Sequence, residues 1–73
     1  YVAVDAKGFV YATDSTTNTV HRFEPGGKAV TQAGGEGNGP GQLRGPKGIT
    51  VDGQGNLYIA DSYNHRVVKA RFP

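Results

Sequence analysis

The sequence predicts an all-β protein of about seven short strands. Three observations carry this prediction: many turn residues, short runs of β-branched and aromatic residues, and an internal repeat. Twelve glycines and four prolines make up more than a fifth of the 73 residues, which suits turns and short strands and is too much for a helical protein. Cysteine, methionine and tryptophan are absent, so the core must come from Val, Ile, Leu, Tyr and Phe, without disulfides or thiolate metal sites.

The internal repeat pairs residues at one constant offset of 47 positions. Seven identities share this offset, all of them between positions 4 and 20 of the first copy. The identical pairs are Val4 and Val51, Asp5 and Asp52, Gly8 and Gly55, Tyr11 and Tyr58, Asp14 and Asp61, Ser15 and Ser62, and Val20 and Val67. Such clustering at a single offset indicates one structural unit that is written nearly twice.

Each copy has the pattern strand, tight turn, strand, turn, strand. The predicted strands are 2–4, 9–13 and 20–23 in the first copy, 49–51, 57–60 and 67–70 in the second, and a weaker run at 29–32 that only the first copy has. Short runs with β-branched and aromatic residues fit this pattern. Residues 57–60 are nearly all apolar, which predicts burial on both faces of the sheet and therefore a second layer, as in stacked repeats.

The turns are predicted from their aspartates and glycines. An Asp-x-x-Gly segment follows the first strand of each copy, and an Asp-Ser pair follows the second. An Asp carboxylate accepts backbone N–H groups two residues on, and a Gly takes the positive φ that ends such a turn. We therefore predict turn residues, and not catalytic acids, at these positions. The predicted structural turn residues are Asp5, Gly8, Asp14, Asp52, Gly55 and Asp61.

The second copy also carries specific motifs. They are a Pro-x-Gly entry at 46–48, Gly-Asn-x-Tyr at 55–58, Ala-Asp-Ser at 60–62 and Asn-His-Arg-Val at 64–67. With these motifs the second copy resembles the NHL repeat closely, and the Gly-rich segment before it resembles the usual NHL inter-blade segment. The first copy departs from the pattern, because residues 17–19 read Thr-Asn-Thr where the second copy has Asn-His-Arg, and Phe9 replaces Asn56.

The resemblance implies a β-propeller, usually six-bladed, whose blades are four-stranded antiparallel meanders. The chain then divides into a first blade at 1–33, a Gly-rich inter-blade loop at 34–48 and a second blade at 49–73 that lacks its outer strand. A propeller protects its sheet edges by closing into a ring, so the partners we expect are further blades or copies of the same chain. We expect an isolated monomer to be poorly stable or to associate. The chain does not begin with Met, which suggests a processed, excised or designed segment.

Antiparallel connectivity predicts which loops share a face. The connection 33–48 and the turn 61–65 lie at one end of the sheets, and the Asp-x-x-Gly turns and residues 24–28 lie at the other. The first end combines basic groups with an aromatic ring, a chemistry that suits a peptide carboxylate, a phosphate or an unstacked base. The candidate ligand-binding residues are Arg44, Lys47, Tyr63, Asn64, His65 and Arg66. In the alternative interpretation, Arg66 pairs with Asp61 and Tyr63 packs on the neighbouring blade.

The leading functional prediction is a non-catalytic binding or assembly scaffold for protein segments. Alternatives are a face that binds single-stranded RNA, a purely structural role, and a fragment or designed derivative of a propeller enzyme of lyase or hydrolase type without a complete active site. No Ser-His-Asp spacing and no His-x-x-x-His pair is present, and the Gly-rich segment lacks the Gly-Lys-Ser/Thr ending of a phosphate loop. We therefore expect no catalytic residues, no metal and no cofactor.

Charge and hydropathy bear on the partners. The formal net charge is +2 with acids and bases interspersed, so long-range attraction to nucleic acid would be weak. No apolar run approaches the roughly 20 residues of a membrane span, and we expect no membrane partner. The absence of cysteine is compatible with reducing and oxidising compartments alike, which leaves the localisation open.

Overall fold

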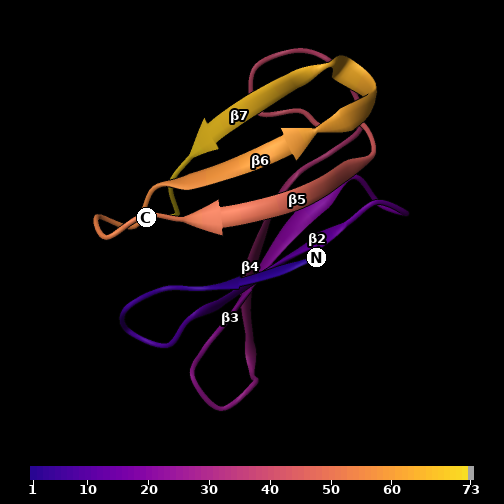
Figure 1. The fold of residues 1–73 in the computed structure, drawn as a ribbon. Coiled ribbons are helices and arrows are strands. Elements are labelled where there is room, and N and C mark those ends of the chain that lie inside the picture. The colour runs from indigo at the N-terminus through magenta and orange to yellow at the C-terminus, as the bar shows by residue number, and fades with distance from the viewer. Residues whose placement is uncertain (73) are drawn as a thin grey trace.

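The computed structural model describes residues 1–72, apart from the side chains of Ala29 and Val30. Within that range the chain forms seven strands in two antiparallel sheets and no α-helix (Figure 1). The first sheet has the order β1 (Val2–Val4), β2 (Val10–Asp14), β3 (Thr19–Phe23), β4 (Ala29–Gly34). The second has the order β5 (Pro46–Val51), β6 (Leu57–Asp61), β7 (Arg66–Ala70), with one 3-10 turn, η1 (Ser62–Asn64), between β6 and β7. The predicted fold class is confirmed.

Six of the seven strands extend beyond the predicted runs, and β4 and β5 do so by more than one residue. β5 begins at Pro46, which pairs with Asp61, and the register shifts between Pro46 and Ile49. Proline has no N–H to donate to a ladder, so the first position of a strand beside an irregularity is where it fits. β4 continues to Gly34, which pairs with Thr19.

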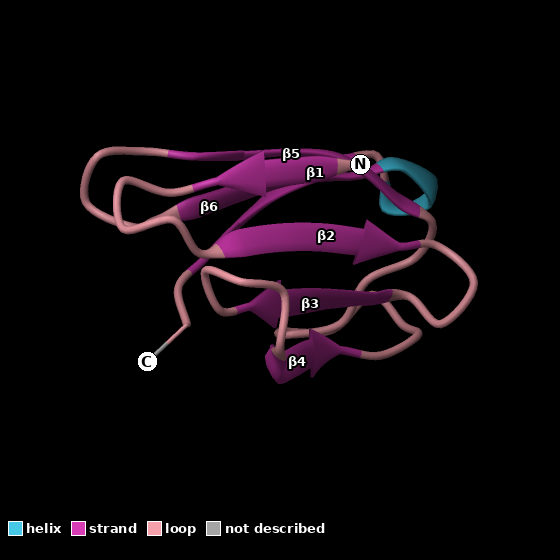
Figure 2. Cartoon of the chain, turned by 90° about the horizontal axis from the view of Figure 1, so that it is seen from below, coloured by secondary structure: helices cyan, strands magenta, loops and turns pink. Residues whose placement is uncertain are grey.

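The core lies between the two sheets. The buried apolar side chains are Tyr11, Val20, Leu43, Leu57 and Ile59. Four of them come from the strands and Leu43 comes from the loop that joins the sheets, so this loop is part of the core. β5 packs against β1 and β2, and Figure 2 shows β5 beside β1, with β4 at the far edge of the first sheet. The first strands of the two sheets are therefore neighbours, as adjacent blades of a radial arrangement require.

Candidate binding face at the blade junction

Asp61 organises the loop that joins the two sheets. Its side chain is fully buried at the end of β6, and its Oδ1 accepts the Arg44 backbone N–H at 2.6 Å. Its Oδ2 accepts hydrogen bonds from the side chains of Asn64 at 2.8 Å and Arg66 at 2.9 Å. Burial alone would raise the pKa of this carboxyl, but the three donors outweigh it and lower the pKa below the ordinary value. A buried anion thus connects the β6–β7 turn to the inter-blade loop.

Two of the predicted ligand-binding residues serve the same loop. Besides Asp61, the Arg66 guanidinium donates to the carbonyl oxygens of Asn38 at 3.0 Å and Gln42 at 2.8 Å. The Asn64 amide also donates to the carbonyl of Gly37 at 2.8 Å. The pairing of Arg66 with Asp61, which was the structural alternative for this arginine, is present. Most of the donors of Arg66 and Asn64 are therefore engaged within the chain.

Asp14, the repeat equivalent of Asp61, has a different environment. Its Oδ1 accepts the backbone N–H groups of Thr16 at 2.9 Å and Thr17 at 3.3 Å, within its own turn. The Thr17 hydrogen bond is the main reason that the pKa of Asp14 is lowered. Asp61 makes no such capping bond to the turn that follows it. The same residue type at the same repeat position thus holds a local turn in one copy and a distant loop in the other.

The Asp-x-x-Gly turns at the other end of the sheets are alike in both copies. Asp5 and Asp52 each accept N–H groups from residues two and four positions on, and a tyrosine hydroxyl from six positions on. Gly8 and Gly55 close these turns at φ 88° and 86°, a conformation that favours glycine. The backbone hydrogen bond from Asn56 is the main reason that the pKa of Asp52 falls to about 2.

A cleft of about 320 Å³ lies at the junction of the two sheets on the inter-blade loop side. Its lining residues are Ser15, Asn18, Glu36, Arg44, Gly45, Lys47 and Tyr63. Three of the predicted residues, Arg44, Lys47 and Tyr63, therefore lie together, and all three are exposed. The sequence pattern did not single out Ser15 and Asn18, because the predicted residues come from the inter-blade loop and the turn of the second copy. The same antiparallel connectivity places the β2–β3 turn at this end too.

Side chains from both sheets and their turns contact the backbone of the residues that line this cleft. Asn18 has a left-handed conformation at φ 60°, and its Oδ1 accepts the Gly45 N–H at 2.8 Å. The Tyr63 ring lies over Gly45, where an added Cβ would come within 2.8 Å of Tyr63 Cδ2. Thr13 Oγ1 donates to the Lys47 carbonyl at 2.9 Å. The cleft is therefore held by both sheets and by the loop between them.

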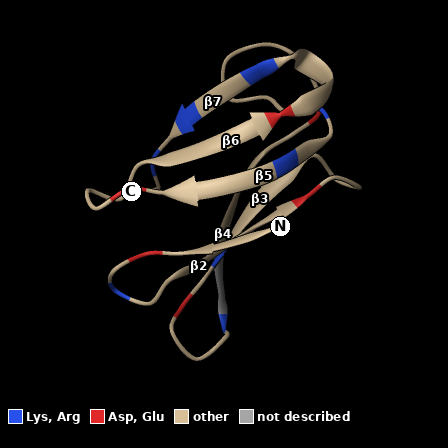
Figure 3. Ribbon diagram, in the orientation of Figure 1, with Lys and Arg blue, Asp and Glu red and all other residues tan. Residues whose placement is uncertain are grey.

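Charge in the cleft comes from two cations and one anion. Arg44 and Lys47 outnumber Glu36, and the Tyr63 ring beside them is 67% exposed. The predicted residue His65 is exposed at the end of η1 with φ 54° and does not line the cleft. Figure 3 shows that basic and acidic residues are dispersed along both sheets and their loops. The arrangement can therefore hold a single carboxylate or phosphate group against an aromatic ring.

Two features of residues 1–72 concern metal ions and membranes. In this range no group of three or more His, Cys, Asp or Glu residues is placed to hold a metal ion. None of the helical segments described is long and apolar enough to cross a membrane.

Comparison with known proteins places the second sheet in a family. The family model of the NHL repeat matches residues 43–70, which run from the buried Leu43 through the last residue of β7. No curated protein matches the chain. The matched stretch contains the three strands of the second sheet, β5, β6 and β7, together with the turn η1. This chain thus carries an NHL repeat at residues 43–70, and this match supports its identification as an NHL-repeat β-propeller segment.

Proposed function

We propose that this chain is a non-catalytic binding and assembly segment of a propeller, whose cleft at the blade junction docks protein segments. NHL repeats build propeller-type binding scaffolds, and such domains are generally non-catalytic. The observation that carries the proposal is the convergence of Arg44, Lys47 and Tyr63 on one cleft, while Asn64 and Arg66 support the loop beneath it. Two cations beside an exposed aromatic ring suit an extended peptide with a carboxylate.

The binding part is tested by removing the exposed cleft groups and leaving the loop supports in place. The triple variant Arg44→Gln, Lys47→Gln, Tyr63→Ala should weaken the binding of a fluorescent acidic peptide by about tenfold or more. Lys28→Gln, an exposed change at the other end of the sheets, is the control and should leave the affinity within about twofold. Equal affinity in the triple variant and the parent chain would contradict docking at this cleft.

Single-stranded RNA is the competing ligand, and a salt series separates the two. RNA held through its phosphates loses affinity steeply with salt because counterions are released. The acidic and basic residues of this chain are dispersed, which favours a peptide over RNA as the ligand. We expect the affinity for the peptide to depend only weakly on salt concentration. Tight RNA binding with a steep slope, together with no peptide binding, would assign the face to nucleic acid instead.

The assembly part rests on the free face of the first sheet. Val2 and Val4 are 62% and 57% exposed and pair with Ala12 and Val10. Cross-strand partners share one face of a sheet. The equivalents of these four residues, 47 positions on, are Ile49, Val51, Leu57 and Ile59, all of which pack in the core between the sheets. The free face of the first sheet is therefore the type of face that a preceding blade covers in this fold.

The mass of the native particle tests the assembly part. Because each chain has a mass of 7.7 kDa, association through this face should give a larger particle in sedimentation experiments. Val4→Lys should shift the particle toward the monomer, since it places a charge on the contact face, whereas Lys28→Gln should not. A monodisperse, cooperatively unfolding monomer would contradict the assembly part.

A further inference from the structure

A second and larger cleft lies at the opposite end of the sheets, between the two Asp-x-x-Gly turns. Its volume is about 650 Å³, within the usual range of ligand sites. The lining residues are Asp5, Ala6, Lys7, Phe9, Tyr11, Arg22, Asp52, Gly53, Gln54, Gly55, Arg71 and Phe72. The cleft shares no residue with the one at the blade junction, so nothing argued above for the Arg44 cleft applies to it.

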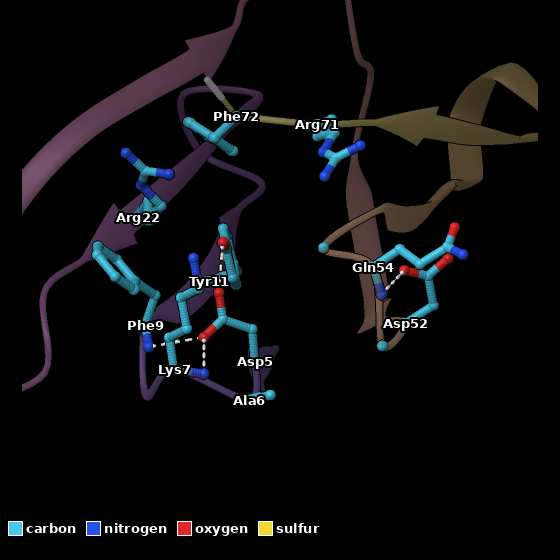
Figure 4. A pocket seen from close by; sticks show the side chains of 12 residues that line it. Asp5, Ala6, Lys7, Phe9, Tyr11, Arg22, Asp52, Gln54, Arg71 and Phe72 are labelled. Atoms are coloured by element: carbon cyan, nitrogen blue, oxygen red, sulfur yellow. Dashed lines mark hydrogen bonds between the residues drawn. The ribbon is translucent and has the colours of Figure 1, made fainter.

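One wall of this cleft is aromatic and cationic. The Arg22 guanidinium carbon lies 4.9 Å from the centre of the Phe9 ring and 5.2 Å from that of Phe72. The Tyr11 and Phe72 rings are 5.7 Å apart. Figure 4 shows Arg22 between the two phenylalanine rings, with Arg71 across the cleft near Gln54. A cation held against aromatic faces is attracted by their electrons, so the rings position Arg22 at the wall.

The two acids in the lining are engaged by their own turns. Asp5 accepts hydrogen bonds from two backbone N–H groups and the Tyr11 hydroxyl. Asp52 accepts two backbone N–H groups, the Asn56 amide and the Tyr58 hydroxyl. Each carboxylate thus accepts hydrogen bonds from its own turn and from the tyrosine of the strand that follows it. The cations of the lining, Lys7, Arg22 and Arg71, outnumber the acids, so an incoming anion is favoured over a cation.

The groups that give this cleft its character differ between the two copies of the repeat. Lys7, Phe9, Arg22, Arg71 and Phe72 stand where the other copy has Gln54, Asn56, Lys69, Glu24 and Pro25. The turn residues Asp, Gly and Tyr are the same in both copies. Position 9 shows the consequence, because Asn56 donates to Asp52 within its turn, whereas the Phe9 ring lies against Arg22. The cleft's chemistry is therefore an addition to the blade scaffold and not a requirement of it.

We propose that this cleft is a second docking site, for an extended protein segment that carries a carboxylate next to an apolar side chain. The carboxylate meets Lys7 and Arg71, both of which are exposed, and the apolar side chain lies on the Phe72 ring. Charge-assisted hydrogen bonds orient the carboxylate, and burial of apolar surface on the ring adds affinity. The chain would then hold protein segments at both ends of one blade junction.

The test is an NMR titration of the 73-residue chain with a capped Leu-Asp-Leu-Glu-Leu peptide. Saturable shifts should appear at the amides of Gly53 and Gly55. The neutral peptide Leu-Asn-Leu-Gln-Leu should bind about tenfold more weakly, because its amides replace the carboxylates. The double variant Lys7→Gln, Arg71→Gln should weaken the acidic peptide by a similar factor.

A matched control separates a site from an effect of net charge. The double variant Lys28→Gln, Lys69→Gln removes the same charge from exposed positions outside the cleft, and should leave the dissociation constant within about twofold. Equal weakening by both double variants would overturn the proposal, as would equal binding of both peptides or the absence of saturable shifts up to millimolar peptide. Loss of these same shifts in the Arg44→Gln, Lys47→Gln variant would also overturn it, since binding would then belong to the other face.

Discussion

Replacing Asp61 by alanine should destabilise the fold more than any other single change at a repeat-equivalent aspartate. The carboxylate is fully buried and accepts the Arg44 backbone N–H and the side chains of Asn64 and Arg66. Breaking a buried ion pair by removing one partner costs about 3–5 kcal/mol. The Arg66 side chain is 35% exposed, so water can solvate part of its charge when Asp61 is removed. We therefore expect a loss of about 3 kcal/mol in the free energy of unfolding. A chain of this length has a total stability of about 4–11 kcal/mol, so the loss is a large fraction of the whole.

Urea unfolding followed by circular dichroism measures this loss. The matched control is Asp14→Ala, because the Asp14 side chain is 39% exposed and its backbone hydrogen bonds lie within its own turn. We expect a clearly smaller loss for that variant. The stability loss of Asp61→Asn should fall between those of the two alanine variants. Its amide oxygen still accepts a hydrogen bond, while its NH₂ group faces another donor and cannot accept one. Equal losses for the two alanine variants would refute the assignment of Asp61 as the anchor of the inter-blade loop.

Three further predictions follow from individual contacts. The pKa of Asp52 is about 2 in the folded chain and ordinarily 3.8, so the unfolded chain binds more protons between these two pH values. The contribution of Asp52 to the free energy of unfolding should therefore be full above about pH 4 and fall toward pH 2. A urea midpoint that stays constant over this pH range would contradict this prediction. Gly34→Ala should lower the free energy of unfolding by about 1–3 kcal/mol more than Gly26→Ala. Both glycines have positive φ, but only at Gly34 does an added Cβ come within 2.8 Å of the Asn18 carbonyl oxygen. Equal urea midpoints for the two variants would argue against this clash. Arg66→Lys should speed amide exchange in the inter-blade loop more than in β6, because a lysine cannot reach several loop carbonyls at once; uniform acceleration would indicate global destabilisation instead.

Much of the fold could be predicted from local patterns. The all-β class follows from turn residues and short β-branched runs, and these act over two to six positions. Asp5 illustrates this, because it bonds to residues two, four and six positions on. The interval of 47 residues showed that a second unit repeats the first, and the second unit's motifs indicated an NHL blade, which the match of the family model to residues 43–70 confirms.

The candidate site could be predicted only in part. Antiparallel connectivity brings the inter-blade loop and the β6–β7 turn to one end, and from this Arg44, Lys47 and Tyr63 were expected to share a face. Connectivity does not say which donors are already engaged. Arg66 and Asn64 bond to loop carbonyls more than 20 residues away, and no spacing in the sequence encodes those contacts.

The sequence by itself determined the unit: an all-β repeat with its turns, its strand order and the NHL motifs of the second copy. Only the tertiary structure decided which of two equivalent aspartates is buried, and where the two clefts lie. The physical reason is range. Turn geometry depends on a few neighbouring residues, whereas the burial of Asp61 and the stacking of Arg22 between Phe9 and Phe72 depend on segments that are distant in sequence and meet when the second sheet packs on the first.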